Sequence, residues 1–108
     1  MNFEEYRRER SKLFAKQPYQ KETNTLLWAS NSLCGEVGEL ANEVKKIFRD
    51  DHGKITDERI NKLMDEGGDV IWYLFFFFED TLGVPLEFLM QRNMDKLKKR
   101  YKINELQL

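Results

Sequence analysis

Two short acidic motifs in the chain have the spacing of metal-binding carboxylates. Glu36 and Glu39 are three positions apart, as are Glu66 and Asp69, and glycines stand within or beside both pairs. Residues three apart on a helix lie about 60° apart around its axis, so each pair presents both carboxylates on one face. Sites built from several carboxylates suit hard divalent ions, with Mg²⁺ or Mn²⁺ preferred where phosphates complete the coordination. The four acids are therefore candidate metal ligands.

The glycines beside these acids are unusual for helical segments. Each glycine inside a helix costs about 1 kcal/mol relative to alanine. Glycine also allows close approach of a neighbouring helix or of a ligand, and the sequence leaves both explanations open. The four glycines are Gly35, Gly38, Gly67 and Gly68.

Length and composition narrow the class of protein. With 108 residues the chain has room for one domain, residues 1–108, around one core. A net charge of −1 argues against a partner that is a nucleic-acid polymer. Cys34 and His52 are the only residues of their types, which excludes an internal disulfide and disfavours a zinc site.

No segment has the properties of a membrane anchor or a secretion signal. The longest apolar run, Val70–Phe78, is far shorter than the ~20 residues needed to span a bilayer. The first residues lack the apolar stretch of a signal peptide. We therefore expect no membrane partner and a cytoplasmic location.

Helical periodicity dominates the chain, and we expect an all-α fold: an antiparallel bundle of four main helices. Asn2 and Thr56 are suitable N-caps, and Gly83 is a suitable C-terminal stop. The expected helices run over about residues 3–15, 25–49, 56–82 and 85–101.

The two acidic motifs should meet if their helices are antiparallel, which the short turn around Gly53 requires. Each acid row is rotated about 100° from the core row of its helix, in the same sense, so antiparallel packing puts both rows on one side. At ~1.5 Å per residue from the turn, Glu39 and Glu66 lie at about 15–17 Å. Glu36 and Asp69 both lie at about 20 Å. The four carboxylates should converge at the edge of the core.

A polar row on the last helix has a different chemistry. Asn93, Lys96 and Arg100 share one face, and a neutral donor with two cations can hold phosphate oxygens. The alternative is a solvated basic face. A similar alternative applies to the four acids: a solvated acidic row that is paired with lysines such as Lys45 or Lys62.

Three blocks of sequence, residues 33–46, 66–74 and 93–101, resemble the MazG-like all-α nucleoside triphosphate pyrophosphohydrolase family. The resemblance covers about residues 25–101. It implies a helical bundle that is catalytic as a dimer or a dimer of dimers. It also implies Mg²⁺-dependent cleavage of nucleoside triphosphates between the α and β phosphates, giving a monophosphate and pyrophosphate. Deoxynucleotides are the preferred substrates in this interpretation.

The resemblance also implies roles for individual residues. The four acids would be the metal ligands, with Glu39 the first choice for the base that accepts the proton of the attacking water. Tyr73 would line the sugar or base and Trp28 would stack on a base, the alternative for both being core packing. The residues implied as phosphate contacts are Asn93, Lys96 and Arg100.

Assembly is expected from the sequence as well. The run Val70–Phe78 is apolar around the whole helix, and a small bundle can bury only part of that surface internally. The surplus predicts a homodimer or homotetramer.

Two other functions stay open. One is phosphoribosyl-ATP pyrophosphohydrolase activity, which uses a similar bundle and similar acids. The other is a non-catalytic helical protein that binds nucleotides or a protein partner. The sequence departs from the MazG-like pattern at Val84-Pro85, where relatives often place a hydroxyl N-cap, and in the bulk of Phe75–Phe78.

Overall fold

The computed structural model describes residues 1–16 and 25–102, and most of these residues are helical, with no strand among them. The prediction of an all-α fold with four main helices is confirmed. No helix in this part of the chain is long and apolar enough to cross a membrane. The elements are α1 (Phe3–Lys16), α2 (Thr25–Asp50), α3 (Asp57–Phe75), the π-helical segment η1 (Phe76–Thr81) and α4 (Leu86–Arg100).

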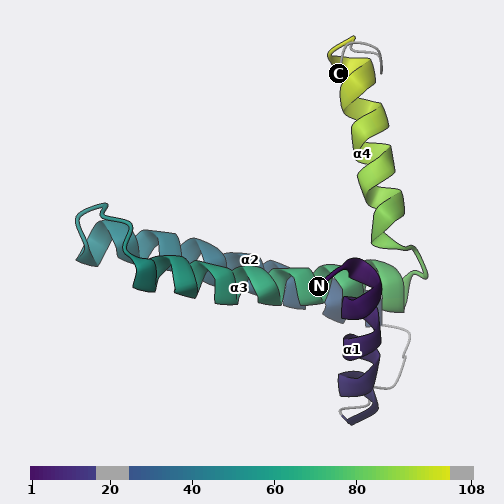
Figure 1. The fold of residues 1–108 in the computed structure, drawn as a ribbon, viewed down its shortest axis with the longest axis horizontal. Helices are drawn as coiled ribbons and strands as arrows, with labels where there is room; N and C mark the ends of the chain where they lie inside the picture. The colour runs from purple at the N-terminus through teal and green to yellow at the C-terminus, as the bar shows by residue number, and fades with distance from the viewer. Residues whose placement is uncertain (17–24, 103–108) are drawn as a thin grey trace.

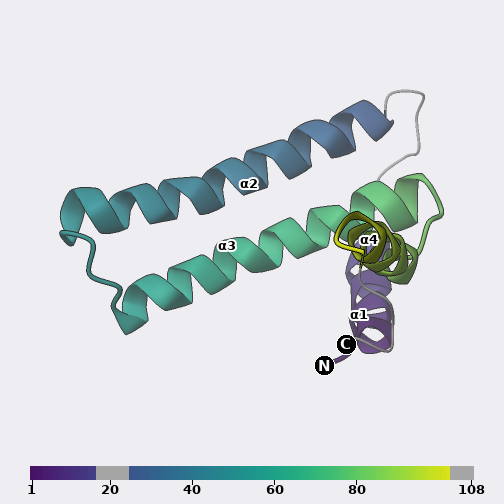
Figure 2. The same ribbon diagram turned by 90° about the horizontal axis from the view of Figure 1, so that it is seen from above.

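The helices α2 and α3 form an antiparallel pair, and α1 and α4 branch from one end of it. The pair packs along its length, and the turn that joins its helices lies at the end far from α1 and α4 (Figures 1 and 2). In Figure 1, α1 and α4 leave the pair in opposite directions. The expected up-and-down packing therefore holds for α2 and α3, whereas α1 and α4 cross the end of the pair.

Local backbone chemistry explains the turn between α2 and α3. His52 and Gly53 have φ values of 53° and 82°, a left-handed conformation that glycine adopts without strain. The Gly53 N–H donates to the Ile47 carbonyl at 3.0 Å, which closes the end of α2. The Thr56 hydroxyl then accepts from the Arg59 N–H at 3.2 Å, so the predicted N-cap is confirmed and α3 begins at Asp57.

The end of the third helix differs from the prediction. We expected an α-helix as far as Leu82, but α3 ends at Phe75 and the chain continues through η1. The neighbouring rings of Phe75 and Phe76 are both buried at this change of helix type. Gly83, with a φ of 68°, then ends the helix as predicted.

The core lies where α1 crosses the end of α3. The Phe3 and Tyr6 rings pack on Phe75, with ring centroids 5.5 Å and 4.9 Å away. Further along α1, Phe14 stacks on Trp72 at 5.2 Å. These contacts cover the side of α3 that α2 leaves open.

Packing of α1 reduces the exposed apolar surface that the sequence analysis expected at Val70–Phe78. Of the apolar run Val70–Phe78, only Ile71 is exposed in the single chain, because the rest is buried or half-buried. The half-buried residues of the run still leave some apolar surface, and whether a second chain covers it stays a prediction.

Glu79 of η1 connects α1 to α4. Arg7 of α1 donates to both oxygens of the Glu79 carboxylate, at 2.8 Å and 2.9 Å. The same carboxylate accepts from the Leu86 N–H at 2.9 Å and so caps α4, which follows Pro85 and has no side-chain cap of its own. Arg7 also pairs with Glu87, and the bonds to Glu79 and Glu87 raise the pKa of its guanidinium.

Arg10 attaches α1 to the other side of the same junction. Its buried guanidinium donates to Asp80 at 2.9 Å and to the Trp72 carbonyl at 3.2 Å, and it lies 4.4 Å from the centre of the Trp72 ring. The direction of α1 is therefore fixed by ion pairs on both carboxylates of η1 as well as by ring packing.

We expect Glu79→Ala to lower the free energy of unfolding by about 1–3 kcal/mol, because it leaves Arg7 and the first turn of α4 without their shared acceptor. Urea denaturation at fixed protein concentration measures this change. The matched control is Glu9→Ala, which removes only an exposed pair with Lys12 and should cost roughly 0.5 kcal/mol or less. Equal effects of the two changes would contradict the junction role of Glu79.

Candidate metal centre

The antiparallel pair brings three of the four predicted ligands together. Glu36 of α2 and Glu66 and Asp69 of α3 can each place one carboxylate oxygen within 4.8 Å of the others. Glu36 and Glu66 are half-buried and Asp69 is exposed. The expected convergence of the two motifs is found in these three side chains, which we call the acidic cluster.

The fourth acid, Glu39, lies beside the acidic cluster and outside its closest group. It is exposed, but its charge contributes to raising the pKa of both Glu36 and Glu66. Glu39 is thus close enough to interact with the cluster electrostatically while its carboxylate stays accessible to solvent.

Burial and like charges both act on the carboxyl groups of Glu36 and Glu66. Burial is the largest cause that raises the pKa of Glu36, followed by the charges of Asp69 and Glu66. Burial likewise leads the rise in the pKa of Glu66, followed by the charges of Asp69 and Glu39. Like charges at this separation favour protonation or a bound cation.

Glu43 shows how the same acid row is neutralised one turn further along α2. It is buried, accepts from Lys46 at 3.0 Å and lies 3.8 Å from the guanidinium of Arg59. Among the described residues, no lysine or arginine pairs with any member of the acidic cluster. The pairing with Lys45 or Lys62 that the solvated-seam alternative expected is therefore not formed in this part of the chain.

The four helical glycines are not explained by packing between α2 and α3. A Cβ atom added at any of them would meet nothing within 4 Å. Among the described residues, close approach of a neighbouring helix is therefore not their cause. The positions are Gly35, Gly38, Gly67 and Gly68.

The two predicted aromatic residues meet at one buried ring. Trp28 of α2 and Tyr73 of α3 both direct an edge-to-face contact at Phe76, with centroids 5.1 Å and 6.3 Å away. Trp28 is exposed and Tyr73 is half-buried, so neither is enclosed in the core. Tyr73 lies one helical turn beyond Asp69, which places this aromatic group next to the acidic cluster.

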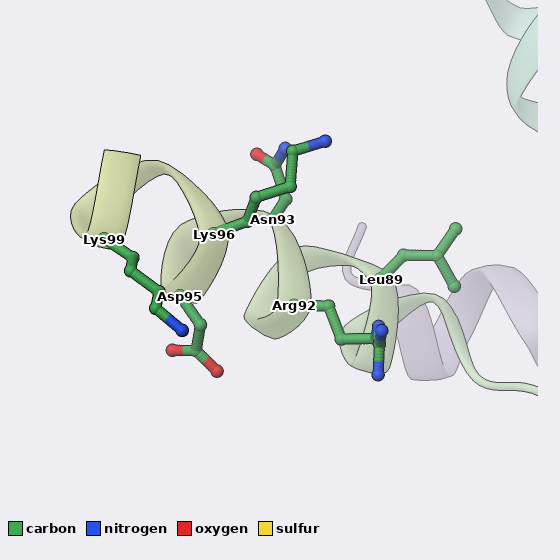
Figure 3. A pocket seen from close by; sticks show the side chains of 6 residues that line it. All are labelled: Leu89, Arg92, Asn93, Asp95, Lys96 and Lys99. Atoms are coloured by element: carbon green, nitrogen blue, oxygen red, sulfur yellow. The ribbon is translucent and has the colours of Figure 1, made fainter. Parts of the chain in front are cut away.

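The predicted phosphate contacts all lie on α4, and two of them line an open pocket. Asn93 and Lys96 line it and point to one side of the helix in Figure 3, whereas Arg100 is not among its lining residues. All three are exposed, and in the single chain α4 extends away from the α2–α3 pair (Figure 1). The structure therefore does not bring them to the acidic cluster of the same chain. The pocket is lined by Leu89, Arg92, Asn93, Asp95, Lys96 and Lys99.

Sequence reasoning missed Tyr6, which α1 brings to the side of the pair that carries the acids. Burial raises the pKa of its phenol, Arg10 opposes that rise and the charge of Asp69 adds to it. No local motif could have indicated this position, because it depends on how α1 packs. Sequence reasoning also did not select Arg92 and Lys99, which line the pocket on α4. Both belong to the basic residues of this helix, and that run was the available sequence signal.

Comparison with known proteins identifies the family to which the chain is similar. A family model described as the MazG nucleotide pyrophosphohydrolase domain matches residues 24–103. The Gene 37 protein of Mycobacterium phage L5 is 45% identical over 75 residues, which cover 69% of this chain and 65% of that protein. The chain thus spans less than two thirds of the length of this relative. No solved structure matches the chain.

The raised pKa values predict how stability depends on pH. A carboxyl whose pKa is higher in the folded state binds more protons there, so its stabilising effect is present below the unfolded value of 4.5 and is lost as pH rises through the folded value. In chelator, Glu66→Gln should therefore raise the thermal midpoint at pH 8 and leave it nearly unchanged at pH 4.

The control for this prediction is Asp65→Asn, which removes an adjacent charge that contributes least to the pKa of Glu66. At pH 8 the thermal midpoint should rise less for Asp65→Asn than for Glu66→Gln. Adding Mg²⁺ should raise the midpoint of the unaltered protein more than that of Glu66→Gln. A lower midpoint for Glu66→Gln than for the unaltered protein in chelator at pH 8 would refute the repulsion.

Proposed function

Because the chain belongs to the MazG nucleotide pyrophosphohydrolase domain family, we propose that it hydrolyses nucleoside triphosphates to a monophosphate and pyrophosphate at the acidic cluster. The observation that carries the proposal is the meeting of Glu36, Glu66 and Asp69 without a paired cation among the described residues. The buried Glu43 of the same helix, by contrast, is neutralised by Lys46. The acidic cluster instead has the charge and the open access of a cation site.

The donor set fits Mg²⁺, with Mn²⁺ as the alternative. Both ions prefer oxygen ligands, and three carboxylates within 4.8 Å of one another supply such ligands from two helices. Glu36, Glu66 and Asp69 would hold the ion, with Glu39 next to them. Bound there, the ion supplies positive charge that offsets the charge of the phosphate chain and lowers the pKa of water.

The side chains around the cluster suit attack of water on the α-phosphorus. Glu39 is exposed beside the cluster and is our candidate for the base that accepts the proton of that water. The bond from the α-phosphorus to its bridging oxygen breaks, and pyrophosphate leaves with that oxygen.

Trp28 and Tyr73 are our candidates for contacts with the nucleoside. Both rings are anchored on Phe76, and the exposed Trp28 can offer its face to a base. Stacking on an aromatic face depends little on which base is bound, so recognition is centred on the phosphates. We propose deoxynucleoside triphosphates as the preferred substrates of such a site.

Hydrolysis of a panel of ribo- and deoxynucleoside triphosphates tests the reaction. We expect nucleoside monophosphate and pyrophosphate in equal amounts, only with Mg²⁺ or Mn²⁺ present. In ¹⁸O-labelled water the label should enter the monophosphate, because water attacks the α-phosphorus. Glu66→Gln should reduce turnover by at least a hundredfold, whereas Asp65→Asn should change it less than threefold, taking roughly 2–4 kcal/mol as the value of one charge-stabilising group.

Other products would point to other functions. Orthophosphate with a nucleoside diphosphate would overturn the mechanism. Hydrolysis of phosphoribosyl-ATP alone would favour the related activity. Binding without any hydrolysis would favour a non-catalytic nucleotide-binding protein.

A second copy of the chain is the partner we propose for the side of the α2–α3 pair opposite the acids. Val37, Val44 and Phe48 of α2 each follow a buried or half-buried residue, and so do Ile60, Met64 and Ile71 of α3. Both exposed rows are therefore rotated in one sense from the α2–α3 contact and share one side of the antiparallel pair. The accessible surface of the chain is 8585 Å², against about 6300 Å² for a compact protein of this mass. The exposed apolar residues of this side are Leu26, Val37, Val44, Phe48, Ile60, Met64 and Ile71.

Sedimentation equilibrium at micromolar concentration tests this assembly. The unaltered protein should be a dimer or a dimer of dimers, and Met64→Glu with Ile71→Glu should weaken association at least tenfold, because charges would be buried at the contact. The control is Leu13→Glu, which adds a charge at an exposed apolar residue of α1. A folded monomer of the unaltered protein would refute the assembly.

A further inference from the structure

A buried arginine lies at the junction where α3 changes into η1. Arg10 of α1 is 4% exposed, although arginine is a residue type that is rarely buried unless it is paired. α1 crosses the end of α3 at this point (Figures 1 and 2). The Arg10 Cζ atom lies 4.9, 4.4 and 5.5 Å from the ring centroids of Phe14, Trp72 and Phe75. Aromatic rings from both helices therefore enclose the guanidinium and fix its position.

The hydrogen bonds of Arg10 connect the two sides of this junction. Its Nη2 donates to the Trp72 carbonyl at 3.2 Å and to the Asp80 carboxylate at 2.9 Å. Trp72 belongs to the last turn of α3, whereas Asp80 belongs to η1. The Trp72 carbonyl also accepts from the N–H of Phe76, the first residue of η1. Arg10 thus joins the end of α3 to the π-helical turn and holds their relative rotation.

Stability alone does not explain an arginine at this position. The Nε–H of Arg10 is buried and makes no hydrogen bond among the described residues. A buried donor without a partner costs free energy, and an apolar side chain of similar length would fill the space without that cost. The directed bonds to Trp72 and Asp80 are what an arginine adds here. The observations therefore favour a role for Arg10 in setting the position of η1.

η1 carries the ring that supports the two candidate nucleoside contacts. Phe76 is 1% exposed, and Trp28 and Tyr73 both pack on it edge-to-face. The Thr81 hydroxyl donates to the Phe76 carbonyl at 3.0 Å, which links the two ends of η1. π-helical turns are frequent at functional sites. A rotation of η1 would move the ring on which both aromatic side chains rest.

The acidic cluster does not depend on η1 in this way. Glu36 lies on α2, and Glu66 and Asp69 lie on α3 before its junction with η1. A rotation of η1 would therefore disturb the support of the aromatic pair and leave the carboxylates in place. The nucleoside part and the phosphate part of the proposed site can thus be changed separately.

From these observations, and resting on the proposed function, we infer that Arg10 is a positioning residue for the nucleoside part of the substrate. Through the Trp72 carbonyl and Asp80 it holds η1 so that Phe76 supports the aromatic pair. Arg10 itself touches neither the substrate nor the cation. It sets the affinity for the nucleoside and leaves the attack of water on the phosphorus unchanged.

Steady-state kinetics of the double variant Arg10→Met with Asp80→Asn test this inference. Both partners change together, so that no buried charge is left unpaired. KM for a deoxynucleoside triphosphate should rise roughly five- to tenfold, the value of about one aromatic contact, while kcat stays within about twofold. Inorganic pyrophosphate with Mg²⁺ lacks a nucleoside, so its inhibition constant should also stay within about twofold.

Two further variants complete this experiment. Arg8→Met is the matched control, because Arg8 is an exposed arginine of the same helix, and it should leave KM unchanged. Thr81→Val removes the bond to the Phe76 carbonyl with almost no change in side-chain volume, and should raise KM while sparing pyrophosphate. A lower thermal midpoint with unchanged KM in both altered junctions overturns the inference. Equal weakening of nucleotide and pyrophosphate also overturns it.

Fluorescence of Trp28 tests the positioning without any turnover. In a Trp72→Phe background, which keeps the backbone carbonyl at position 72, Trp28 is the only tryptophan of the chain. Its emission should shift to longer wavelength, and acrylamide should quench it more strongly, in the Arg10–Asp80 and Thr81 variants than in Arg8→Met. Unchanged emission in these variants overturns the inference. Changed emission in a protein that hydrolyses no nucleotide would retain the positioning by Arg10 and reject the proposed function.

Discussion

The short connection between α2 and α3 is the constraint from which the rest of the arrangement follows. It leaves the two helices no choice but to run antiparallel, closed by the left-handed pair His52 and Gly53. Because the acid rows are rotated from the core in the same sense on both helices, they then face one flank together. The same rule sends the exposed apolar rows to the other flank. The turn between α2 and α3 thus places the acidic residues on one side of the helix pair and the exposed apolar residues on the other.

The parts of the fold set by neighbouring residues could be predicted from the sequence. The cap at Thr56, the stop at Gly83 and the meeting of Glu36 with Glu66 all follow from spacing within one or two helices. Membership of the MazG family followed from three ordered blocks. The roles of the site residues, and the treatment of residues 1–108 as one domain, remain predictions.

The parts set by contacts between distant elements could not be predicted. Arg7 reaches Glu79 across 72 positions, and this ion pair helps to hold α1 while the same carboxylate caps α4. Periodicity contains no information about such a pair, because any exposed arginine could have formed it. The cover that α1 gives to Phe75, the position of Tyr6 beside the acids and the direction of α4 were missed for this one reason.

The π-helical segment η1 has a consequence for how this chain can tolerate insertions and deletions. A π-turn holds more residues than an α-turn, so the wider turn can absorb the loss of one residue from the run Phe76–Phe78 by returning to α-helical winding. The residues that follow would then keep nearly the same orientation, with Glu79 still turned towards Arg7 and α4 starting in the same direction. What such a deletion removes is one ring of the phenylalanine cluster, in which Phe75 and Phe76 are buried. In this segment the identity of the buried rings is more strictly constrained than the number of residues.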